Sequence, residues 1–312
     1  MAKYGAKPWG KVFELKSVGL QDVTTLPGFK AEKLYDVPSA EQGSWVGLTY
    51  DHKNRLIACD QYGGFYRITL NTKPLQIENL NVKVSGAHGV LYAFDSLYVF
   101  AYGSGLYRLQ DTNGDDQFDR EELIIPFKSK GEHGVHSIVL TPDKKSLYLV
   151  MGNNADLPDS VKNTRMMKNW SEDHLLTRMD DGRGHNRGRL APGGLVIKIS
   201  PDAKEQELIA HGFRNQFDGA FNANGDFFVY DADMEYDIGS PWYRPTRVNH
   251  VVSGADFGWR HGTGKWPGYY TDTLPTTLDI GPGSPTGVTS GLGAKFPAKY
   301  QNAIFINDWT YG

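Results

Sequence analysis

An arginine followed by an asparagine, Arg214-Asn215, lies in the polar segment His211–Gly219 between two runs that are typical of β-strands. These runs are Gly194–Ile199 before the segment and Asp226–Asp231 after it. A permanently charged, planar donor beside an amide, held at the ends of rigid strands, suits a ligand with carboxylate or carbonyl groups. The alternative is an arginine that bonds only to nearby loop carbonyls.

Two histidines lie in the glycine-flanked segment Gly131–Ser137. His133 and His136 are the best general-base candidates, because a histidine at the mouth of a site can take up a proton near neutral pH. Residues three apart point to opposite faces of a strand, so at most one of the two is expected to face the site. His88 occupies the matching place in an earlier copy of the same pattern. A repeated packing role is therefore the alternative for these histidines.

The acidic segment Asp111–Glu122 has the spacing of a loop that wraps around a hard cation such as Ca²⁺. Its oxygen-bearing side chains at loop positions 1, 3, 5, 9 and 12 are Asp111, Asn113, Asp115, Asp119 and Glu122. Asp116 stands where such loops usually have glycine, and no flanking helices are expected. We predict a structural calcium loop in a hairpin, with a merely acidic turn as the alternative.

Two further polar runs are candidates for a role at the site. The acidic run Asp231–Asp237 could hold a second Ca²⁺ or pair with arginines such as Arg214 and Arg244. The glycine-rich, cationic run Asp180–Arg189 follows no strand-to-helix pattern, so it does not indicate a phosphate loop. We interpret it as a lid.

Short strand-like runs recur in clusters of three or four, and they are the elements that must position these residues. The first cluster is Trp45–Tyr50, Arg55–Asp60 and Gly64–Ile68; the second is Gly89–Phe94, Ser96–Phe100, Gly105–Leu109 and Glu122–Ile125. The third is Ser137–Leu140, Ser146–Val150, Leu195–Ile199 and Glu207–Ile209; the fourth is Gly219–Phe221, Phe227–Tyr230 and Arg247–Val252. A four-stranded unit that repeats at about 40 to 50 residues predicts an all-β fold, a β-propeller.

The fifth copy, Gly291–Ala294 with Ala303–Ile306, stops at Tyr311-Gly312, where the first two copies continue into a third strand. We therefore expect a fragment of a longer protein, truncated in the fifth blade and lacking a sixth. Three long connections interrupt the repeat: 155–192, 231–247 and 261–283. Loops longer than about 15 residues in a compact domain are usually functional, so we expect them to cover one mouth of the central channel.

Composition narrows the function further. The chain has 312 residues and a formal net charge of -3, which gives no basic surface for nucleic acid. Cys59 is the only cysteine, so the sequence holds no disulfide, thiolate metal site or haem attachment motif, and Cys59 is expected to pack as an apolar group. No run suits a membrane span or a signal peptide. We expect an extension at 1–25, with a strand at Ala31–Tyr35 opening a propeller domain at 26–312.

At this point the motifs resemble those of soluble quinoprotein glucose and sorbosone dehydrogenases over roughly residues 131–259. The matching motifs are Gly212–Asn215, Gly219, Gly225-Asp226, Arg247–Asn249 and Gly254–Trp259. The resemblance implies a six-bladed propeller, TolB-like or quinoprotein glucose dehydrogenase-like, that uses pyrroloquinoline quinone (PQQ) and Ca²⁺. It also implies that His133 is the catalytic histidine and that Arg214 and Asn215 contact the quinone.

The wider chain, including Gly43–Val46 and Asp60–Gly64, is similar to the propeller of large proteins known as membrane-bound dehydrogenases. This second resemblance implies helical repeats and a c-type cytochrome domain beyond the propeller, and export to the periplasm. One departure is clear. The lysine of the sugar dehydrogenases should fall near Asn307–Thr310, where this sequence has none.

The sequence thus predicts a quinone-dependent oxidoreductase that acts on a sugar or another alcohol. In this hypothesis His133 removes the hydroxyl proton, hydride passes to the quinone, and Arg214 and Asn215 orient the quinone. Two alternatives stay open, because a fold does not determine a function. One is a calcium-dependent sugar lactonase, and the other is a non-catalytic binding platform.

Overall fold

The computed structural model describes residues 19–129, 131–166, 177–180, 184–234, 243–262 and 265–310. The chain divides into two compact units, Met1–Asp36 and Val37–Gly312. In the first unit, residues 19–36 contain a 3₁₀ turn, η1 (Leu20–Asp22), and the strand expected at Ala31–Tyr35 is not formed. None of the helices in these ranges has the length and apolar character needed to cross a membrane.

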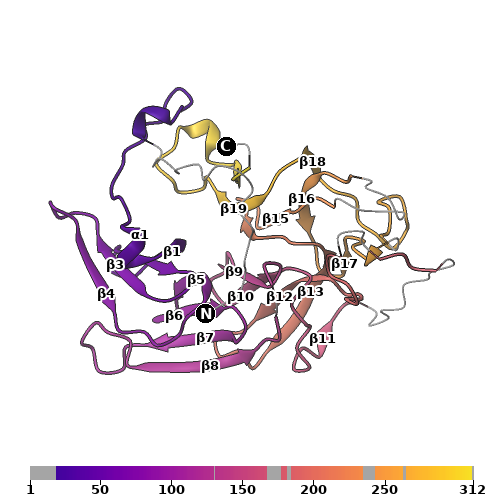
Figure 1. Cartoon of the computed structure of the whole chain (residues 1–312), viewed down its shortest axis with the longest axis horizontal. Coiled ribbons are helices and arrows are strands. Elements are labelled where there is room, and N and C mark those ends of the chain that lie inside the picture. The colour runs from indigo at the N-terminus through magenta and orange to yellow at the C-terminus, as the bar shows by residue number, and fades with distance from the viewer. Residues whose placement is uncertain are drawn as a thin grey trace. The chain divides into compact units, whose positions relative to one another are not determined.

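The second unit begins with the short helix α1 (Ser39–Gln42) and continues as a series of antiparallel sheets (Figure 1). The first sheet contains β1 (Trp45–Tyr50), β2 (Leu56–Asp60), β3 (Phe65–Thr69) and β4 (Gln76–Leu80). The second contains β5 (Ala87–Ala93), β6 (Ser96–Ala101), β7 (Gly105–Gln110) and β8 (Arg120–Pro126). Each strand pairs with the next one along the chain.

The later sheets follow the same order. The third contains β9 (Val135–Leu140), β10 (Leu147–Met151), β12 (Gly194–Ile199) and β13 (Gln206–Phe213), and both β11 (Asn163–Thr164) and β17 (Ala255–Asp256) pair in parallel with β13. The fourth contains β14 (Asp218–Phe221), β15 (Phe227–Asp231), β16 (Thr246–Val251) and β18 (Leu278–Gly281). The fifth contains β19 (Pro285–Ser290) and β20 (Ile304–Asp308), with η3 (Ala298–Tyr300) between them.

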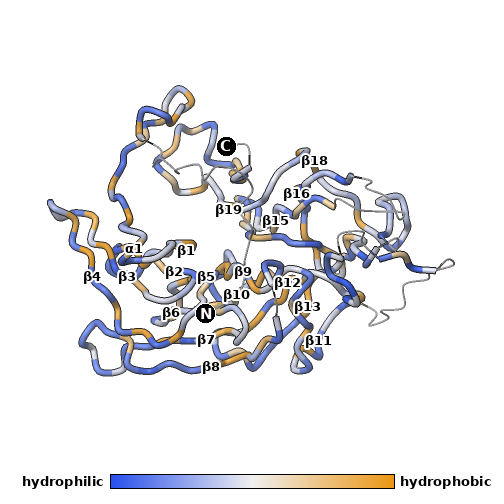
Figure 2. The backbone as a smooth tube through the Cα atoms, in the orientation of Figure 1, coloured by the Kyte–Doolittle hydropathy of each residue, from blue (hydrophilic) through white to orange (hydrophobic). Residues whose placement is uncertain are grey.

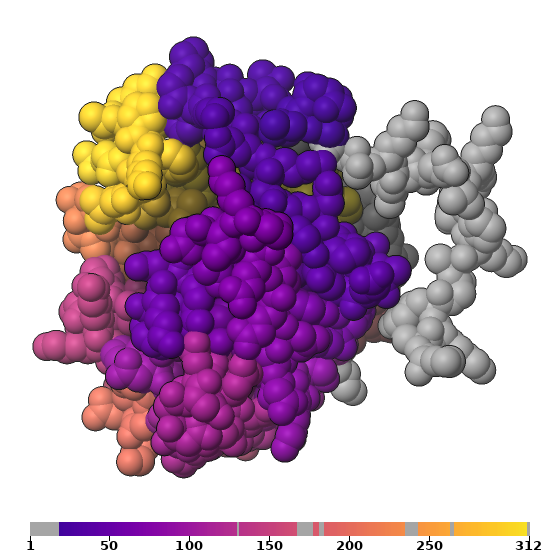
Figure 3. Space-filling view, turned by 90° about the vertical axis from the view of Figure 1, so that its left-hand side faces the viewer, coloured from indigo at the N-terminus to yellow at the C-terminus, as the bar shows by residue number. Residues whose placement is uncertain are grey.

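The first strands of successive sheets lie side by side, β1 on β5, β5 on β9, β9 on β14 and β14 on β19. Each sheet runs outward from there, so that β4, β8 and β18 lie farther from the centre (Figure 1). Figure 3 shows the first two sheets, indigo to magenta, adjoining one another on one face. This arrangement confirms the predicted all-β propeller. In the described residues, four sheets have the four strands of a blade and a fifth has two. The ring of six blades that the resemblance implies is not seen there and stays a prediction.

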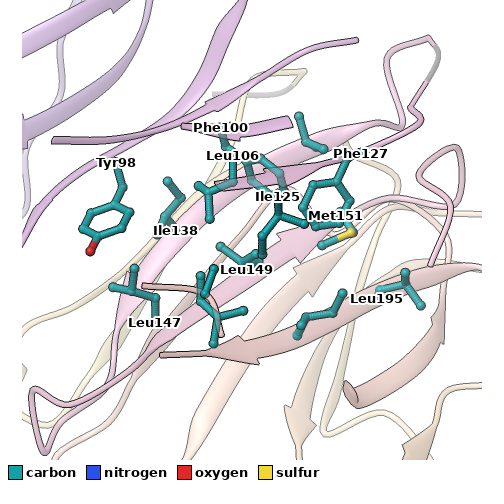
Figure 4. Packing of buried hydrophobic residues seen from close by; sticks show 14 of the residues in the cluster. Tyr98, Phe100, Leu106, Ile125, Phe127, Ile138, Leu147, Leu149, Met151 and Leu195 are labelled. Atoms are coloured by element: carbon teal, nitrogen blue, oxygen red, sulfur yellow. The ribbon is translucent and has the colours of Figure 1, made fainter. Parts of the chain in front are cut away.

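Apolar cores lie between neighbouring sheets. Phe100 and Leu106 of the second sheet are fully buried against Leu147 and Leu149 of the third (Figure 4). Burial of each such side chain contributes roughly 1.5–3 kcal/mol to stability. Hydrophobic stretches accordingly fall within the strands, and the connecting loops are mainly hydrophilic (Figure 2). Cys59 is fully buried in the core between the first two sheets, packed as expected.

The inner three strands of the full blades agree with the sequence analysis, whereas three other strands do not. Outer strands β4 and β18 do not show apolar alternation, so the sequence does not predict them. Leu80 is the one buried residue of β4, and three of the four β18 residues are exposed. The prediction of a strand at Gly291–Ala294 was wrong, since these residues form a turn and the strand is β19. Val288 is the only large apolar residue of β19, which explains why the pattern was not recognised.

The innermost strands of the first three sheets share an irregularity. Between two paired positions, each strand carries one residue more than its partner, a β-bulge. The extra residues are Val46 in β1, His88 in β5 and His136 in β9. Because a bulge re-aims a side chain, these three residues all line the central channel, a cavity of about 870 Å³ bounded by β1, β5, β9, β14 and β19.

Candidate functional site

A second cavity, of about 500 Å³, contains the residues that the sequence singled out. It is lined by Glu132, His133, His185, Arg214, Asn215, Phe217, Ala232, Asp233, Gly283, Ser284, Pro285, Thr286 and Trp309, and we call it the mouth pocket. Its residues come from the turns before β9 and β14, from the connection between β10 and β12, from the segments after β15 and β20, and from the start of β19 with the turn before it. The volume falls in the usual range for a small-molecule site. His133, Arg214 and Asn215 therefore share one cavity.

The turn Arg214-Asn215 is held by Asp231, a fully buried residue at the end of β15. One carboxylate oxygen accepts hydrogen bonds from the backbone N–H groups of Asn215 at 2.8 Å, Ala232 at 3.0 Å and Arg214 at 3.1 Å. The other oxygen accepts from Nη2 of Arg247 at 3.0 Å, directly across the β15–β16 pair. A buried carboxylate thus fixes the backbone of the two candidate ligand-binding residues. The sequence indicated Asp231 only as part of an acidic run.

The Arg214 guanidinium lies on the wall of the mouth pocket opposite a carboxylate. Its Nη1 is 3.6 Å from Oδ1 of Asp233, and both side chains are largely buried. The pairing of the acidic run with Arg214 was one of the two roles proposed for that run. Residues 235–237 of the run lie outside the part of the chain that the structure describes.

His133 is buried in the turn before β9, and its Nδ1 lies 2.8 Å from the amide of Asn153. With its nitrogen toward Nδ1, the Asn153 amide also donates to the Arg214 carbonyl and accepts from Nε1 of Trp259, both at 3.2 Å. This orientation makes the most hydrogen bonds, so we assign Nδ1 as an acceptor and Nε2 as the protonated nitrogen. Burial and the Arg214 charge lower the pKa of His133 to about 2, which keeps the ring neutral.

His185 is a pocket residue that the sequence analysis did not single out. Its Nε2 lies 3.2 Å from Nδ1 of His133, and the two rings meet edge to face with centroids 4.3 Å apart. Arg189, in the same segment, donates to the Asn153 carbonyl at 3.1 Å. The long connection between β10 and β12 therefore contributes to the pocket wall, and its role as a lid stays a prediction. Residues 167–176 and 181–183 lie outside the described ranges. The only signal in the sequence was a histidine in a glycine- and arginine-rich run.

Of the two candidate bases, His133 lines the mouth pocket and His136 lines the central channel. His88 also lines the central channel. Nε2 of His136 lies 2.6 Å from Oδ1 of Asn215. The His136 ring packs against Phe217, tilted by 30° with centroids 4.6 Å apart, and stacks on His88, with centroids 6.2 Å apart. His88 and His136 thus have a packing role, and His136 also contacts a candidate quinone-binding residue.

The candidate calcium loop joins β7 to β8 and does not line the mouth pocket. Asp111 accepts the backbone N–H groups of Gly114 and Asp116 at 2.7 and 2.8 Å, and Asp119 accepts that of Thr112. The other ligand candidates are also engaged, Asn113 and Asp115 within the loop and Glu122 with Arg108. Within the described ranges no three His, Cys, Asp or Glu side chains converge as a metal site. Calcium here stays a prediction.

Asp116, which replaces the usual glycine of such loops, joins the first two blades. It accepts two hydrogen bonds from Arg55, at 2.6 and 2.8 Å, and Lys53 lies 3.1 Å away. The Arg55 guanidinium holds the pKa of this carboxyl well below its usual range. The carboxylate of Asp116 in this loop is therefore already paired with two cationic side chains, Arg55 and Lys53.

Trp309 also lines the mouth pocket, at the end of β20. Its segment, Asn307–Thr310, lacks the lysine of the sugar dehydrogenases. An aromatic face stands in this segment instead, and it can stack on a flat ring.

Comparison with known proteins gives matches among solved structures alone. No family model matches the chain, and no curated protein sequence matches it. The PQQ-bound aldose sugar dehydrogenase of Streptomyces coelicolor is similar at 15% identity and a TM-score of 0.57, over 85% of this chain and 81% of that one. The carbohydrate-active family AA12 enzyme of Trichoderma reesei is similar at 12% identity and a TM-score of 0.59, over 80% and 71%.

The PQQ domain of pyranose dehydrogenase from Coprinopsis cinerea is also similar, with 12% identity and a TM-score of 0.52, over 80% of this chain and 68% of that one. At these identities the likeness concerns the fold. The resemblance noted in the motifs is therefore confirmed at that level, because the neighbours of this structure include PQQ-dependent sugar dehydrogenases. The chain has the β-propeller fold that those quinoprotein sugar dehydrogenases share.

Proposed function

We propose that this protein is a quinone-dependent oxidoreductase that oxidises a CH–OH group of a sugar or another alcohol. The observation that carries the proposal is the convergence of His133, Arg214 and Asn215 on one cavity of about 500 Å³. These are the residues that the motif resemblance assigns to proton removal and quinone binding. The fold shared with PQQ-dependent sugar dehydrogenases supports the same conclusion.

The polar groups of the mouth pocket fit PQQ, which carries carboxylates and quinone carbonyls. Arg214 brings a positive charge, and Ser284 and Thr286 bring hydroxyl groups. The amide nitrogen of Asn215 donates to no acceptor in the described part of the chain, so it is available to a ligand carbonyl. When bound, PQQ supplies the electron acceptor that the side chains themselves lack.

The residues of the chain supply proton transfer and charge stabilisation. Nε2 of His133 would take the substrate hydroxyl proton, and PQQ would supply the acceptor for the hydride of the same carbon. The alcohol would lose one proton and one hydride, which carries both electrons, and so become a carbonyl. Nε2 can accept a proton only when the ring proton lies on Nδ1. That state requires the Asn153 amide to turn its oxygen toward Nδ1, at the same 2.8 Å separation. Arg214 stabilises the developing negative charge.

Four finer features belong to this proposal. Calcium binding by the Asp111–Glu122 loop is supported by its oxygen spacing. A six-bladed ring, export to the periplasm and electron transfer to a c-type cytochrome are supported by the sequence resemblance.

The proposal is tested by dye-linked oxidation of a broad sugar and alcohol panel, with and without PQQ and Ca²⁺. Activity should require PQQ, and Arg214→Ala should weaken PQQ binding in a direct titration. Arg120→Ala is the matched control, because this exposed arginine lies on β8 outside the pocket. If no substrate is oxidised and PQQ does not bind saturably, the dehydrogenase proposal is rejected in favour of a binding platform.

A further inference from the structure

Among the described residues, one neighbour makes a hydrogen bond to the Asn215 side chain. Its Oδ1 lies 2.6 Å from Nε2 of His136, which approaches from the channel side. Its Nδ2 has no hydrogen-bond partner in the described ranges, and the residue lines the mouth pocket. The amide therefore has one end engaged by the protein and the other end available to a ligand. If the NH₂ end faces the pocket, the pocket selects a hydrogen-bond acceptor; if the oxygen end faces it, the pocket selects a donor.

His136 cannot easily turn away from this contact. It is the bulge residue of β9, it is only 1% exposed, and its ring packs against those of both Phe217 and His88. The ring is 30° from the plane of Phe217 and 13° from that of His88. Stacking of this kind leaves the imidazole little freedom to rotate out of its plane.

The remaining ring nitrogen of His136 fixes the direction of the hydrogen bond. Nδ1 is buried and has no partner in the structure as described. A buried N–H without an acceptor is rarer and more costly than a bare acceptor without a donor. The favoured tautomer therefore has its hydrogen on Nε2, which donates to Oδ1 of Asn215, and a lone pair on Nδ1. With that tautomer the amide NH₂ of Asn215 is the end left for the pocket.

We propose that His136 is a positioning residue that holds the Asn215 carboxamide with its NH₂ group toward the mouth pocket, so that the pocket selects a hydrogen-bond acceptor. With the Arg214 guanidinium on the same wall, the ligand must present carbonyl or carboxylate oxygen atoms there. The identity of that ligand as a quinone rests on the proposed function. The orientation of the amide does not, because it follows from contacts within the protein alone.

The first test needs no ligand. Protein with ¹⁵N-labelled histidine is examined by NMR, and long-range correlations from the ring protons assign the tautomer of His136. We expect the proton on Nε2, with Nδ1 showing the shift of an unprotonated nitrogen. A His136 ring with its proton on Nδ1 would reverse the hydrogen bond, and the proposal would then be wrong whether or not the protein binds a quinone.

The second test measures PQQ affinity by titration of the purified protein, independently of turnover. His136→Phe keeps a stacked ring without the donor, and we expect about tenfold weaker binding. His136→Gln can still donate to Asn215 and should recover most of this loss. Asn215→Asp keeps the acceptor for His136 but presents an oxygen to the pocket, so binding should weaken by more than tenfold.

Two comparisons separate positioning from a structural effect. His88→Phe is the matched control, because His88 stacks in the same row but makes no bond to Asn215, and PQQ affinity should change less than twofold. Adding His136→Phe to Asn215→Ala should cause no further loss, because the amide that His136 orients is gone. An equal loss in both backgrounds, or in His88→Phe, would contradict the proposal. Failure of the wild-type protein to bind PQQ would reject the proposed function, and the NMR result would still decide this inference.

Discussion

Asp231 and Arg247 face each other across β15 and β16, where Oδ2 of the fully buried aspartate accepts a hydrogen bond from Nη2 of the arginine at 3.0 Å. The same carboxylate also holds the backbone of Arg214 and Asn215. This single group therefore couples the stability of the fourth blade to the geometry of the mouth pocket.

We expect Asp231→Asn to be strongly destabilising, because Arg247 loses its buried counter-ion. Removal of one partner of a buried ion pair typically costs about 3–5 kcal/mol. Urea denaturation monitored by fluorescence measures the free energy of unfolding. The matched control is Asp226→Asn, whose carboxylate is 43% exposed and should change this free energy by less than about 0.5 kcal/mol. Equal effects of the two variants would mean that the buried pair contributes nothing.

Asn153→Asp should convert His133 into a stronger base. A carboxylate at 2.8 Å from Nδ1 can only accept, so it holds the ring proton on Nδ1 and leaves Nε2 unprotonated. The new negative charge should raise the pKa of His133 by roughly 1–3 pH units from its lowered value. NMR titration of labelled histidine measures this pKa. An unchanged or lower pKa would show that the Asn153 amide does not control the tautomer.

Stability should fall as the pH decreases from about 6.5 to 5, because four wholly or partly buried histidines have lowered pKa values, so that the folded state takes up protons at these residues less readily than the unfolded chain does. Burial is the main cause for His133 (about 2), His136 (about 4), His88 and His211. Below about pH 6.5 the unfolded chain binds protons that the folded chain does not, which favours unfolding by up to about 1.4 kcal/mol per pH unit for each histidine.

One buried group acts in the opposite direction. Burial raises the pKa of Asp218 to about 6, so its protonated form favours the folded state below that pH and its contribution is lost as the pH rises. One carboxyl cannot outweigh four histidines, so the net loss on acidification remains. Urea denaturation midpoints measured between pH 5 and 6.5 show whether stability falls on acidification. His136→Gln should make the dependence of the midpoint on pH weaker by the contribution of one histidine. A midpoint that rises on acidification would rule out neutral buried histidines.

Calcium should stabilise the protein if the Asp111–Glu122 loop binds it. Free Ca²⁺ at about 100 times its Kd raises the free energy of unfolding by about 2.7 kcal/mol. Thermal unfolding with Ca²⁺ and with a chelator measures the effect, and Asp115→Asn should reduce it by removing a ligand charge. Asp202→Asn is the control, because this exposed aspartate lies outside the loop. Identical melting curves with Ca²⁺ and with chelator would eliminate the calcium loop.

The sequence was sufficient for the fold class and for the inner strands because those strands are buried and their apolar residues alternate or run together. It was not sufficient for β4, β18 and β19, whose stability comes from pairing with a neighbour and not from a pattern of their own. Strand propensity is dominated by such tertiary context.

The same limit applies to the site. The positions of His133, Arg214 and Asn215 at strand ends were visible in the repeat, so their convergence could be predicted. Asn153 and His185 act through contacts that span 20 and 52 residues of sequence from His133. The sequence around Asn153 and around His185 does not indicate that either residue contacts His133.

The bulges of β1, β5 and β9 have a consequence for how this scaffold can change. Each places one side chain, Val46, His88 or His136, at the channel, between two residues that both pair with the neighbouring strand. Side chains at these three positions can therefore be exchanged while the strands around the channel keep their arrangement. A small library that varies Val46 and His88 and keeps His136 could give the channel a different polarity in each member while all members retain the same blades.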